Sequence, residues 1–571
     1  MLKKNTVLTI DVQSVTAKGF GVSRVALQHA KTQGKKSTQG KKPAQNNLPL
    51  AKNSTPQAST QDFVLFTEGT LPGDKLTVQV IKVKPRYGYS KILKILHPSP
   101  HRIQSPCPVS DKCGGCQWQD CDYNAQLGFK KDIVKDALTR IGGIENAPVA
   151  DVIGMDVPQP YRNKAVFPVV PAVGDKSVDG DKSVDGVKKT LLLKENKAEA
   201  TGFEIGMYAP RSHRIIPITN CLIQHPAHMP MLEALRHHMR QYNIPAYDET
   251  THKGIVRYII VRTSIATKEV MVILVVNGNG IPQESTLVKA LTAAGATTIV
   301  INPNREKTNT IMGETFRVVT GNGFIREQIG EIWYQLSPPS FFQVNPTQTK
   351  VLYDIAVEMA GLTGTETVMD AHVGVGGVLL QAASKSKEVI GVDIVAEAIQ
   401  DAEKNAKLNN ITNARFICGA AEEIIPKLLA QGKEVSTEAS NEVSNEVSNV
   451  ASNITSNEAP ADISKENPMT QHNNGTIPDV VFLDPPRKGC ETPLLDALIT
   501  ARIKTIVYIS CDPATLARDI KRLTTGGYTL KAAQPVDLFP MTGKVETVAL
   551  LHISDRYSNP NPTKEEANHA G

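Results

Sequence analysis

The sequence VVFLDPPRKGC occupies residues 480–490, and TIVYISCDPA follows at residues 505–514. Each begins with an apolar run long enough for one buried strand and continues into residues typical of a turn. Upstream, TVMDAHVGVGG at 367–377, EVIGVDI at 388–394 and ARFICGA at 414–420 repeat the pattern, with helical stretches between them. This alternation is typical of a doubly wound parallel sheet, so the sequence predicts an α/β domain in this part of the chain.

The rest of the chain predicts two further domains. At 571 residues, the chain exceeds the size that one hydrophobic core usually serves. Residues 6–95 alternate apolar and polar side chains between glycine turns, which is typical of a small β-barrel. The next segment combines a cysteine cluster, a helix predicted over 125–141 and hairpin-like strands, and we interpret it as an α+β domain. We expect the three domains at residues 1–96, 97–336 and 337–557.

Three inserts and a tail interrupt or extend these domains. The inserts lie at about residues 29–61, 174–186 and 434–475, and the tail at 558–571. All four are low in apolar residues and have no repeat long enough for a solenoid. We expect disordered, solvated segments there.

The overall composition is that of an ordinary soluble protein. The chain has 63 Lys and Arg residues against 57 Asp and Glu residues, a formal net charge of +6. This excess favours polyanionic partners, but it is too small to decide the function. The N-terminal residues lack the apolar core of a signal peptide, and no apolar run reaches the length of a membrane span. We expect a cytoplasmic protein with no membrane or protein partner.

A glycine-rich loop follows the first strand of the α/β domain. Asp370 ends that predicted strand, and Gly374, Gly376 and Gly377 allow a ligand to approach the backbone closely. Asp393 ends the next predicted strand, where a carboxylate suits the ribose hydroxyls of a nucleoside cofactor. A tight strand-to-helix turn would explain the glycines equally well, so the cofactor interpretation depends on the downstream motifs.

Three reactive side chains are predicted at one edge of the sheet. Asp484 ends the fourth strand, before two prolines that stiffen the turn. Cys511 ends the fifth strand in a Ser-Cys-Asp-Pro turn, whereas packing cysteines usually lie within strands. Glu546 begins the last strand, where we expect a half-buried carboxylate that faces the cleft.

Together these groups suit methyl transfer to carbon 5 of uracil. That carbon is a poor nucleophile until a group adds to carbon 6 and converts the ring to an enolate. The Cys511 thiolate would make this addition, and Glu546 would remove the proton from carbon 5 after methyl transfer, so that the thiolate is expelled. Because both faces of the base must be reached, the uridine has to be flipped out of its stack.

A cysteine cluster lies between the barrel and the predicted helix. Cys107, Cys113 and Cys116 have C-x5-C-x2-C spacing, and Cys221 is a distant fourth. Four thiolates can hold either a [4Fe-4S] cluster or zinc, and the spacing does not distinguish the two. The remaining cysteines are expected to be small packing residues: Cys121, Cys418 and Cys490.

With these motifs, and with SFFQVNP at 340–346 and FPMTGKVE at 539–546, the chain resembles the RNA uracil-C5 methyltransferases, specifically those that act on 23S ribosomal RNA. The resemblance covers nearly everything outside the inserts. It implies an N-terminal TRAM domain, an OB-like barrel that binds RNA. It also implies a middle domain in which the four cysteines hold a [4Fe-4S] cluster, and a Rossmann-like class I domain that uses S-adenosyl-L-methionine (SAM).

The same resemblance implies residue roles. Cys511 matches the nucleophile and Glu546 the base, and four positions match contacts to SAM: Gln343, His372, Asp393 and Asp484. The chain departs from the family at two of these. His372 stands where an aromatic residue is typical, and Asp393 where Glu is typical. Because Asp is one methylene shorter, we expect longer or water-bridged ribose contacts.

Three alternatives remain open. The target could be transfer RNA, or the chain could be a non-enzymatic RNA-binding ribosome assembly factor with a decayed methyltransferase domain. The altered glycine loop favours decay, whereas the retention of Cys511, Glu546 and Asp484 argues against it. The third alternative, DNA cytosine-C5 methylation, shares the chemistry. Those enzymes usually have their nucleophile after Pro and have no use for a TRAM barrel or an iron-sulfur cluster.

Overall fold

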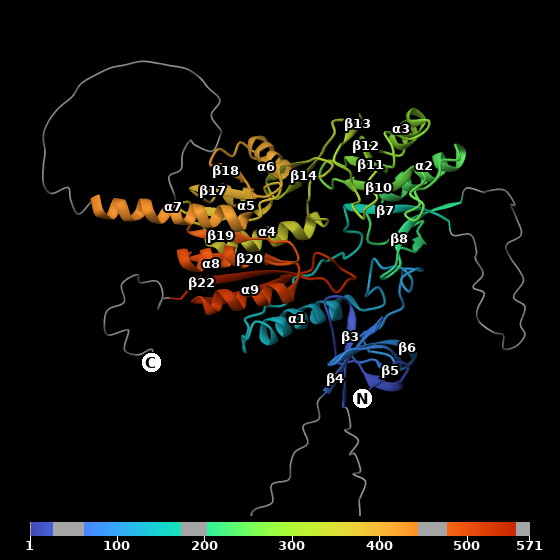
Figure 1. Cartoon of the computed structure of the whole chain (residues 1–571), viewed down its shortest axis with the longest axis horizontal. Helices are drawn as coiled ribbons and strands as arrows, with labels where there is room; N and C mark the ends of the chain where they lie inside the picture. The colour runs from blue at the N-terminus through green and yellow to red at the C-terminus, as the bar shows by residue number, and fades with distance from the viewer. Residues whose placement is uncertain (1, 27–61, 173–201, 443–476, 555–571) are drawn as a thin grey trace, which may run out of the picture.

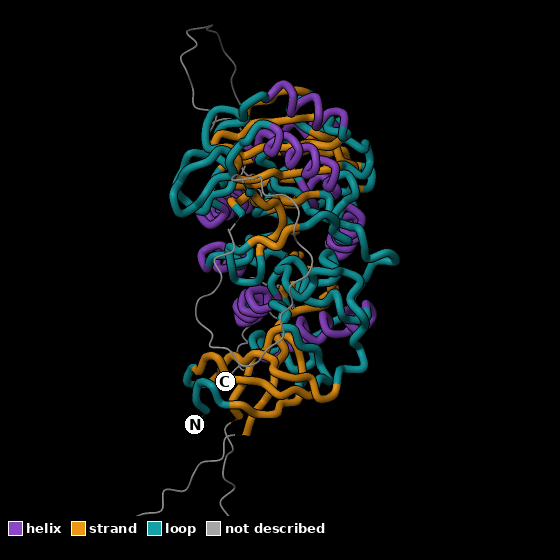
Figure 2. Tube along the Cα trace, turned by 90° about the vertical axis from the view of Figure 1, so that its right-hand side faces the viewer, coloured by secondary structure: helices purple, strands orange, loops and turns teal. Residues whose placement is uncertain are grey.

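We describe the protein from a computed structural model, which defines residues 2–26, 62–172, 202–442 and 477–554. The predicted inserts at 29–61 and 174–186 and the tail at 558–571 lie outside the described residues, as does most of the insert at 434–475. In Figure 1 the N-terminal sheet lies below the other two sheets, and Figure 2 shows the same separation from the side.

The N-terminal sheet has six strands in the order β1-β5-β6-β4-β3-β2. β4 and β6 are parallel, and the other neighbouring pairs are antiparallel. The alternation seen in the sequence turns Ile10, Leu65 and Leu76 inward, where they are buried. The strands are β1 (Val7–Asp11), β2 (Ser14–Val15), β3 (Phe20–Ala26), β4 (Asp62–Glu68), β5 (Lys75–Val83) and β6 (Tyr87–His97).

The middle sheet has seven strands in the order β13-β12-β11-β10-β7-β8-β9. Its centre is the predicted antiparallel hairpin β10–β11, whose side chains are all buried. The strands are β7 (Lys164–Pro171), β8 (Phe203–Tyr208), β9 (Ile215–Pro217), β10 (Val256–Thr263), β11 (Val270–Val276), β12 (Thr298–Pro303) and β13 (Arg317–Thr320). Two helices contribute to its core: α2 (His228–Gln241) and α3 (Glu284–Ala293).

The C-terminal sheet also has seven strands, in the order β18-β17-β16-β19-β20-β22-β21. The five predicted strands are parallel, and β22 runs antiparallel to both β20 and β21. The strands are β16 (Thr367–Asp370), β17 (Glu388–Asp393), β18 (Ala414–Cys418), β19 (Val480–Leu483), β20 (Thr505–Ser510), β21 (Tyr528–Val536) and β22 (Glu546–Ile553). The helices are α4 (Pro346–Ala360), α5 (Gly377–Ala383), α6 (Ala396–Leu408), α7 (Ala421–Glu442), α8 (Thr492–Ala501) and α9 (Pro513–Thr525).

Two elements from the middle part of the sequence pack against the C-terminal sheet. Helix α1 (Tyr123–Arg140) lies beside α9, and its Val134 and Leu138 are fully buried in the same core as Leu516 and Ile520. The hairpin of β14 (Ile325–Ile329) and β15 (Ile332–Leu336) joins a second core that includes α4 and α5. The domain boundary that we expected near residue 336 therefore falls between segments whose side chains pack in the same hydrophobic cores.

One helix extends into a segment that we expected to be a loop. Helix α7 continues to Glu442, although the insert was expected to begin at about residue 434. The three Glu residues and Ala439 in residues 434–442 favour a helix, although Val, Ser, Thr and Asn make up the rest of this stretch. Among the described residues, no helix combines the length and the apolar character needed to cross a membrane.

Candidate active site

The carboxyl ends of the parallel strands open into a cleft of about 1750 Å³. Ligand sites in open α/β sheets lie at these strand ends, because the loops that leave the strands converge there. Residues from all three sheet regions line the cleft, including the tip of the β2–β3 turn at residues 16–18. It brings together the six residues to which we assigned catalytic or cofactor roles: Gln343, His372, Asp393, Asp484, Cys511 and Glu546.

Cys511 lies between the end of β20 and the start of α9. Asp512 caps that helix by accepting hydrogen bonds from the backbone N–H groups of Ala514 (3.0 Å) and Thr515 (3.3 Å), which fixes the turn around the thiol. The cysteine is half-buried. Burial, followed by the charges of Glu546 and Asp484, raises the pKa of its thiol to about 11, so the group is a thiol in the free protein.

Glu546 is the first residue of β22 and pairs with Val536 of β21. We expected a half-buried carboxylate, but the side chain is only 3% exposed because the hairpin and the cleft wall enclose it. Burial, together with the nearby charge of Asp484, raises the pKa of Glu546 to about 8. The residue is therefore poised to gain or lose a proton near neutral pH.

Asp484 directly follows β19 and precedes Pro485 and Pro486. Burial raises the pKa of this half-buried carboxyl to about 7. It also acts on the pKa values of Glu546 and Cys511, so the three groups lie close enough to influence one another's protonation. Such mutual perturbation within a cleft is typical of catalytic sites.

The glycine loop adopts a conformation that favours glycine at two positions. Gly374 has φ +54° and Gly376 has φ +99°, both in the left-handed region. Asp393 stabilises the loop, because its carboxylate accepts hydrogen bonds from the backbone N–H groups of Gly374 (2.9 Å) and Val395 (2.9 Å). The acid predicted to bind a ribose is thus fixed at the cleft wall.

His372 lies in the same loop, and burial lowers its pKa to about 4, so its imidazole is neutral at neutral pH. Its Nδ1 atom is buried and has no hydrogen-bond partner among the described residues. A buried polar nitrogen without a partner is costly in a protein, so a ligand in the cleft is a suitable partner. The backbone N–H of His372 donates to Asp370 (3.0 Å) and thereby connects the loop to β16.

Gln343 is 8% exposed and lies just before α4, which Asn345 caps by accepting a hydrogen bond from the backbone N–H of Gln348 (3.3 Å). Two apolar side chains at the cleft were not predicted as site residues, although both adjoin motifs that we quoted. Phe341 is 71% exposed and Ile394 is 68% exposed, and both line the cleft. Large apolar side chains that are this exposed in a cleft suit contact with an aromatic ring.

Cationic side chains from separate parts of the chain also line the cleft: Lys18, Arg162, Arg487, Lys488 and Lys544. Arg487, Lys488 and Lys544 belong to the motifs DPPRKGC and FPMTGKVE, whereas Lys18 and Arg162 belong to no motif that we quoted. Only the folded structure brings all of them to one cavity.

The four predicted ligand cysteines are all half-buried and lie near one another. The charges of Cys107, Cys113 and Cys221 all raise the pKa of the Cys116 thiol, although burial is the larger cause. Among the described residues, no three His, Cys, Asp or Glu side chains are arranged to share one metal ion. The cysteines predicted to pack differ in their environment, because Cys121 and Cys490 are buried whereas Cys418 is exposed, so the prediction for Cys418 is wrong.

Three family profiles match the chain. Residues 48–93 match the TRAM domain, residues 362–466 match a methyltransferase domain, and residues 430–554 match tRNA (uracil-5-)-methyltransferase. The first match confirms the expected identity of the N-terminal barrel. The other two cover most of the C-terminal sheet and the strand ends that form the cleft.

Whole-chain relatives agree with these profiles. The chain is 38% identical over 500 residues to an uncharacterized RNA methyltransferase of Halalkalibacterium halodurans, covering 87% of this chain and 94% of that protein. It is also 38% identical over 492 residues to one of Clostridium tetani, covering 86% and 92%. In fold it is similar to the tRNA (uracil-54, C5)-methyltransferase of Pyrococcus abyssi, solved with S-adenosyl-L-homocysteine. That match has a TM-score of 0.61 and 22% identity, and it covers 95% of this chain and 100% of that one. The chain therefore belongs to the RNA uracil-C5 methyltransferase family that carries a TRAM domain.

Proposed function

We propose that the protein forms 5-methyluridine in structured RNA, with 23S ribosomal RNA as its target, and that Cys511 and Glu546 carry the reaction. One observation carries the proposal: Cys511, Glu546 and Asp484 line the same cleft as the glycine loop and Asp393. A nucleophile, a base and a cofactor site within one cavity are what this methylation requires.

In the first step the sulfur of Cys511 forms a bond to carbon 6 of uracil, and the electron pair of the 5,6 double bond moves toward the carbonyl oxygen at carbon 4. Bound SAM supplies an electrophilic methyl group. Carbon 5 takes this methyl group as the bond from methyl to sulfonium breaks, which leaves S-adenosyl-L-homocysteine. Glu546 then removes the proton from carbon 5, the double bond re-forms, and the bond from carbon 6 to sulfur breaks.

The pKa values support this division of roles. A carboxyl with a pKa of about 8 is, once it has lost its proton, a stronger base than an ordinary carboxylate, which suits removal of the proton from carbon 5. The Cys511 thiol has a pKa of about 11, so it must lose its proton as substrate binds. Arg487 favours this loss, because its positive charge lowers the pKa of Cys511.

The glycine loop fits SAM. Asp393 offers a fixed carboxylate for the ribose hydroxyls, and the buried Nδ1 of His372 offers a polar contact with no competing partner among the described residues. Ile394 adds an exposed apolar side chain beside Asp393 for the adenine ring.

The cationic group at the cleft supports an RNA substrate. Lys18 comes from the TRAM barrel, whereas Arg162, Arg487 and Lys544 come from the other two regions. Positive charges from all three regions around one cavity suit a polyanion that spans the domains. This arrangement favours an RNA with tertiary structure over an isolated nucleotide.

We also propose that Cys107, Cys113, Cys116 and Cys221 hold a [4Fe-4S] cluster. Two sulfurs already accept hydrogen bonds of the kind that surround such clusters, from the Gly115 N–H to Cys113 (3.4 Å) and from Gln119 Nε2 to Cys116 (3.5 Å).

Anaerobically purified protein should accordingly be brown and contain iron and labile sulfide, both lost in Cys116→Ser. The cluster has no redox role in the reaction, because methyl transfer moves no net electrons. Stoichiometric zinc without iron would contradict this assignment.

The target can be tested with labelled SAM and three substrates: domain-length fragments of 23S ribosomal RNA, transfer RNA and unstructured RNA. We expect 5-methyluridine at a defined position of a ribosomal fragment and none in the other two. Methylation of transfer RNA alone would move the assignment to that substrate. RNA binding without methylation of any substrate would favour the assembly-factor alternative.

A further inference from the structure

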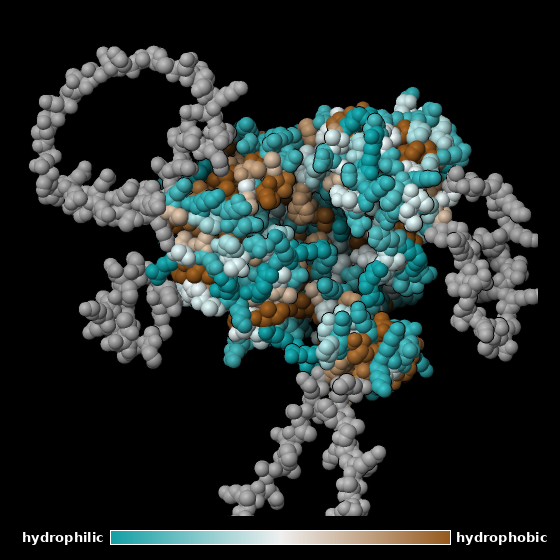
Figure 3. All heavy atoms as spheres, viewed as in Figure 1, coloured by the Kyte–Doolittle hydropathy of each residue, from teal (hydrophilic) through white to brown (hydrophobic). Residues whose placement is uncertain are grey.

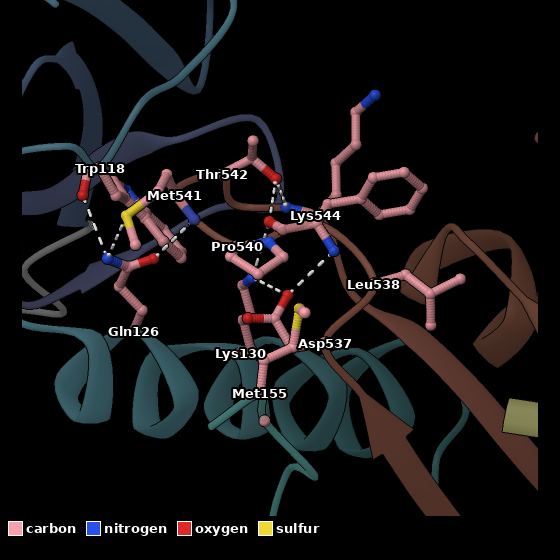
Figure 4. Close-up of polar contacts among 12 residues, drawn as sticks. Trp118, Gln126, Lys130, Met155, Asp537, Leu538, Pro540, Met541, Thr542 and Lys544 are labelled. Carbon is pink, nitrogen blue, oxygen red and sulfur yellow. Dashed lines mark hydrogen bonds and ion pairs between the residues drawn. The ribbon is translucent and has the colours of Figure 1, made fainter. Parts of the chain in front are cut away.

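A second group of contacts converges on the turn that precedes Glu546. This turn, residues 537–545, connects β21 to β22, and we call it the junction turn. Figure 4 shows Gln126 and Lys130 projecting toward it from α1. The junction turn adjoins the last residue pair of the β21–β22 hairpin, Val536 and Glu546. Its shape therefore bears directly on where the Glu546 carboxylate lies.

A buried ion pair fixes the start of the junction turn. Lys130 Nζ donates to Asp537 Oδ1 at 2.5 Å, and neither side chain is exposed at all. The same ammonium donates to the backbone carbonyl of Phe539 (3.1 Å). Tyr123 donates to the other carboxylate oxygen of Asp537 (3.0 Å). All of these partners lie more than 400 residues apart in sequence, at separations of 407, 409 and 414.

The middle of the turn is held in a strained conformation. Met541 has φ +66°, in the left-handed region that a residue with a side chain rarely adopts. Its N–H donates to Gln126 Oε1 (3.0 Å), and its carbonyl accepts from the N–H groups of Gln117 (3.0 Å) and Trp118 (3.1 Å). Such strain persists only where the surroundings impose it, and here α1 and the loop before it do so.

The TRAM barrel contacts the turn as well. A Cβ atom added at Gly543 would meet the carbonyl oxygens of Thr16 and Ala17 and the nitrogen of Gly19 at 3.0 to 3.1 Å. Residues 16–18 also line the cleft. The junction turn is thus held by the TRAM tip and by α1, and it leads into Glu546.

We propose that Lys130 and Gln126 are positioning residues for the reaction, which hold the junction turn so that Glu546 reaches the carbon 5 proton. This inference rests on the proposed function. A buried ion pair is a poor choice for stability alone, because an apolar pair of similar volume often stabilises a protein as well. The ion pair instead fixes the position of the junction turn, because a charge-assisted hydrogen bond has a defined geometry.

The test uses full-length protein and separates proton removal from folding. Lys130→Met leaves the buried Asp537 carboxylate without its cation, although Tyr123 still donates to it, and loosens the start of the turn. We expect the release of 5-methyluridine to slow at least tenfold, while the affinity for SAM stays within twofold of wild type. The fraction of enzyme trapped as a SAM-dependent covalent RNA adduct should rise above the wild-type level. Gln126→Met should change the same quantities in the same direction.

The double variant Lys130→Met/Asp537→Asn distinguishes positioning from stability. It removes the unpaired charge, so its melting temperature should return toward that of wild type, but the turn still lacks the Lys130 ammonium that ties residue 537 and the Phe539 carbonyl to α1, and the adduct should persist. If Lys130→Met does not fold, this double variant carries the test. Recovery of both melting temperature and release rate would overturn the inference.

Two control variants lie on the same helix. Lys131→Met removes a surface pair with Asp151, whose side chain is 94% exposed, and should behave as wild type. Leu138→Ala destabilises α1 where it packs beside α9, and should lower the melting temperature without accumulating adduct. The inference would be contradicted if Leu138→Ala accumulated adduct, or if a folded Lys130→Met released 5-methyluridine at the wild-type rate. Wild-type protein that never methylates RNA would instead refute the proposed function itself.

Discussion

Burial raises the pKa values of the reactive residues of the cleft and so disfavours their charged forms. The pKa values are about 11 for Cys511, about 8 for Glu546 and about 7 for Asp484. Neighbouring acids reinforce burial for Cys511 and Glu546, because a second negative charge nearby disfavours ionisation. In the proposed reaction Cys511 and Glu546 must therefore each lose a proton before they can act as nucleophile and base.

The raised pKa of Glu546 predicts a pH-dependent cost to stability. The pKa of Glu546 rises from 4.5 to about 8 on folding, so its contribution to stability is full below pH 4.5 and is lost as pH rises through 8. Glu546→Gln cannot ionise, and at about 1.4 kcal/mol per pKa unit it should gain a few kcal/mol over wild type across that window. Thermal melts at pH 5 and pH 9 measure the effect. An equal difference in melting temperature at both pH values would contradict it.

The sequence predicted where most of the candidate site residues lie in the fold, because these residues lie directly at strand ends. Asp484 and Cys511 each follow a short apolar run, and parallel strands bring such ends together regardless of the rest of the fold. Arg162 and Lys544 could not be found in this way, since only tertiary packing brings them to the cleft. The full burial of Glu546 was missed for the same reason.

Among the structural elements, the glycine loop holds two glycines with the same left-handed backbone but different surroundings. Gly374 and Gly376 both have positive φ, but a Cβ at Gly376 would lie 2.5 Å from Leu380 Cδ1, whereas one at Gly374 meets no protein atom within 4 Å. Gly374 also lines the cleft. A side chain at the first glycine would therefore enter the cleft, whereas one at the second would clash with the packing at the start of α5.

Two matched substitutions test this division. In each, Ala in the left-handed region costs about 1 kcal/mol. Gly376→Ala adds a clash with Leu380 and should lower the melting temperature by several degrees. Gly374→Ala should stay nearly as stable but bind SAM at least tenfold more weakly, as measured by calorimetry. Equal SAM affinity in wild type and Gly374→Ala would show that the ligand does not approach this loop.

The order of the elements was also largely predictable, whereas their docking was not. The five parallel strands and the helix expected at 125–141 are present, the helix as α1 over Tyr123–Arg140. The sequence did not reveal that α1 packs beside α9, because Val134 and Leu138 form an ordinary apolar face that could cover either domain. The contacts of Lys130 with the junction turn follow from that docking.

In the whole molecule, the TRAM barrel belongs to the cleft rather than forming a separate appendage. Its tip lines the cavity, and its outer face carries exposed apolar side chains on β5 and β6, visible as brown surface in Figure 3. Exposed lysines lie among them: Lys82, Lys84, Lys91 and Lys94. Positive charges mixed with apolar surface suit the backbone and bases of unpaired RNA.

Lys18 offers a direct test of this arrangement. If it contacts a phosphate at the cleft, Lys18→Ala should weaken RNA binding and reduce the slope of log affinity against log salt by about 1. SAM binding should not change. Lys504→Ala is the matched control, because Lys504 precedes β20 and so lies at the opposite ends of the strands from the cleft. If Lys18→Ala left the salt dependence unchanged, the TRAM tip would not contact the bound RNA.

The central claim, that Cys511 and Glu546 act in sequence on one uridine, is tested most directly by trapping the intermediate between them. Glu546→Gln protein is incubated with SAM and a substrate RNA and run on a denaturing gel. We predict a covalent protein-RNA complex that requires SAM, contains a methylated base and is absent from Cys511→Ala/Glu546→Gln. Normal turnover by Glu546→Gln, or the same complex without Cys511, would contradict the account.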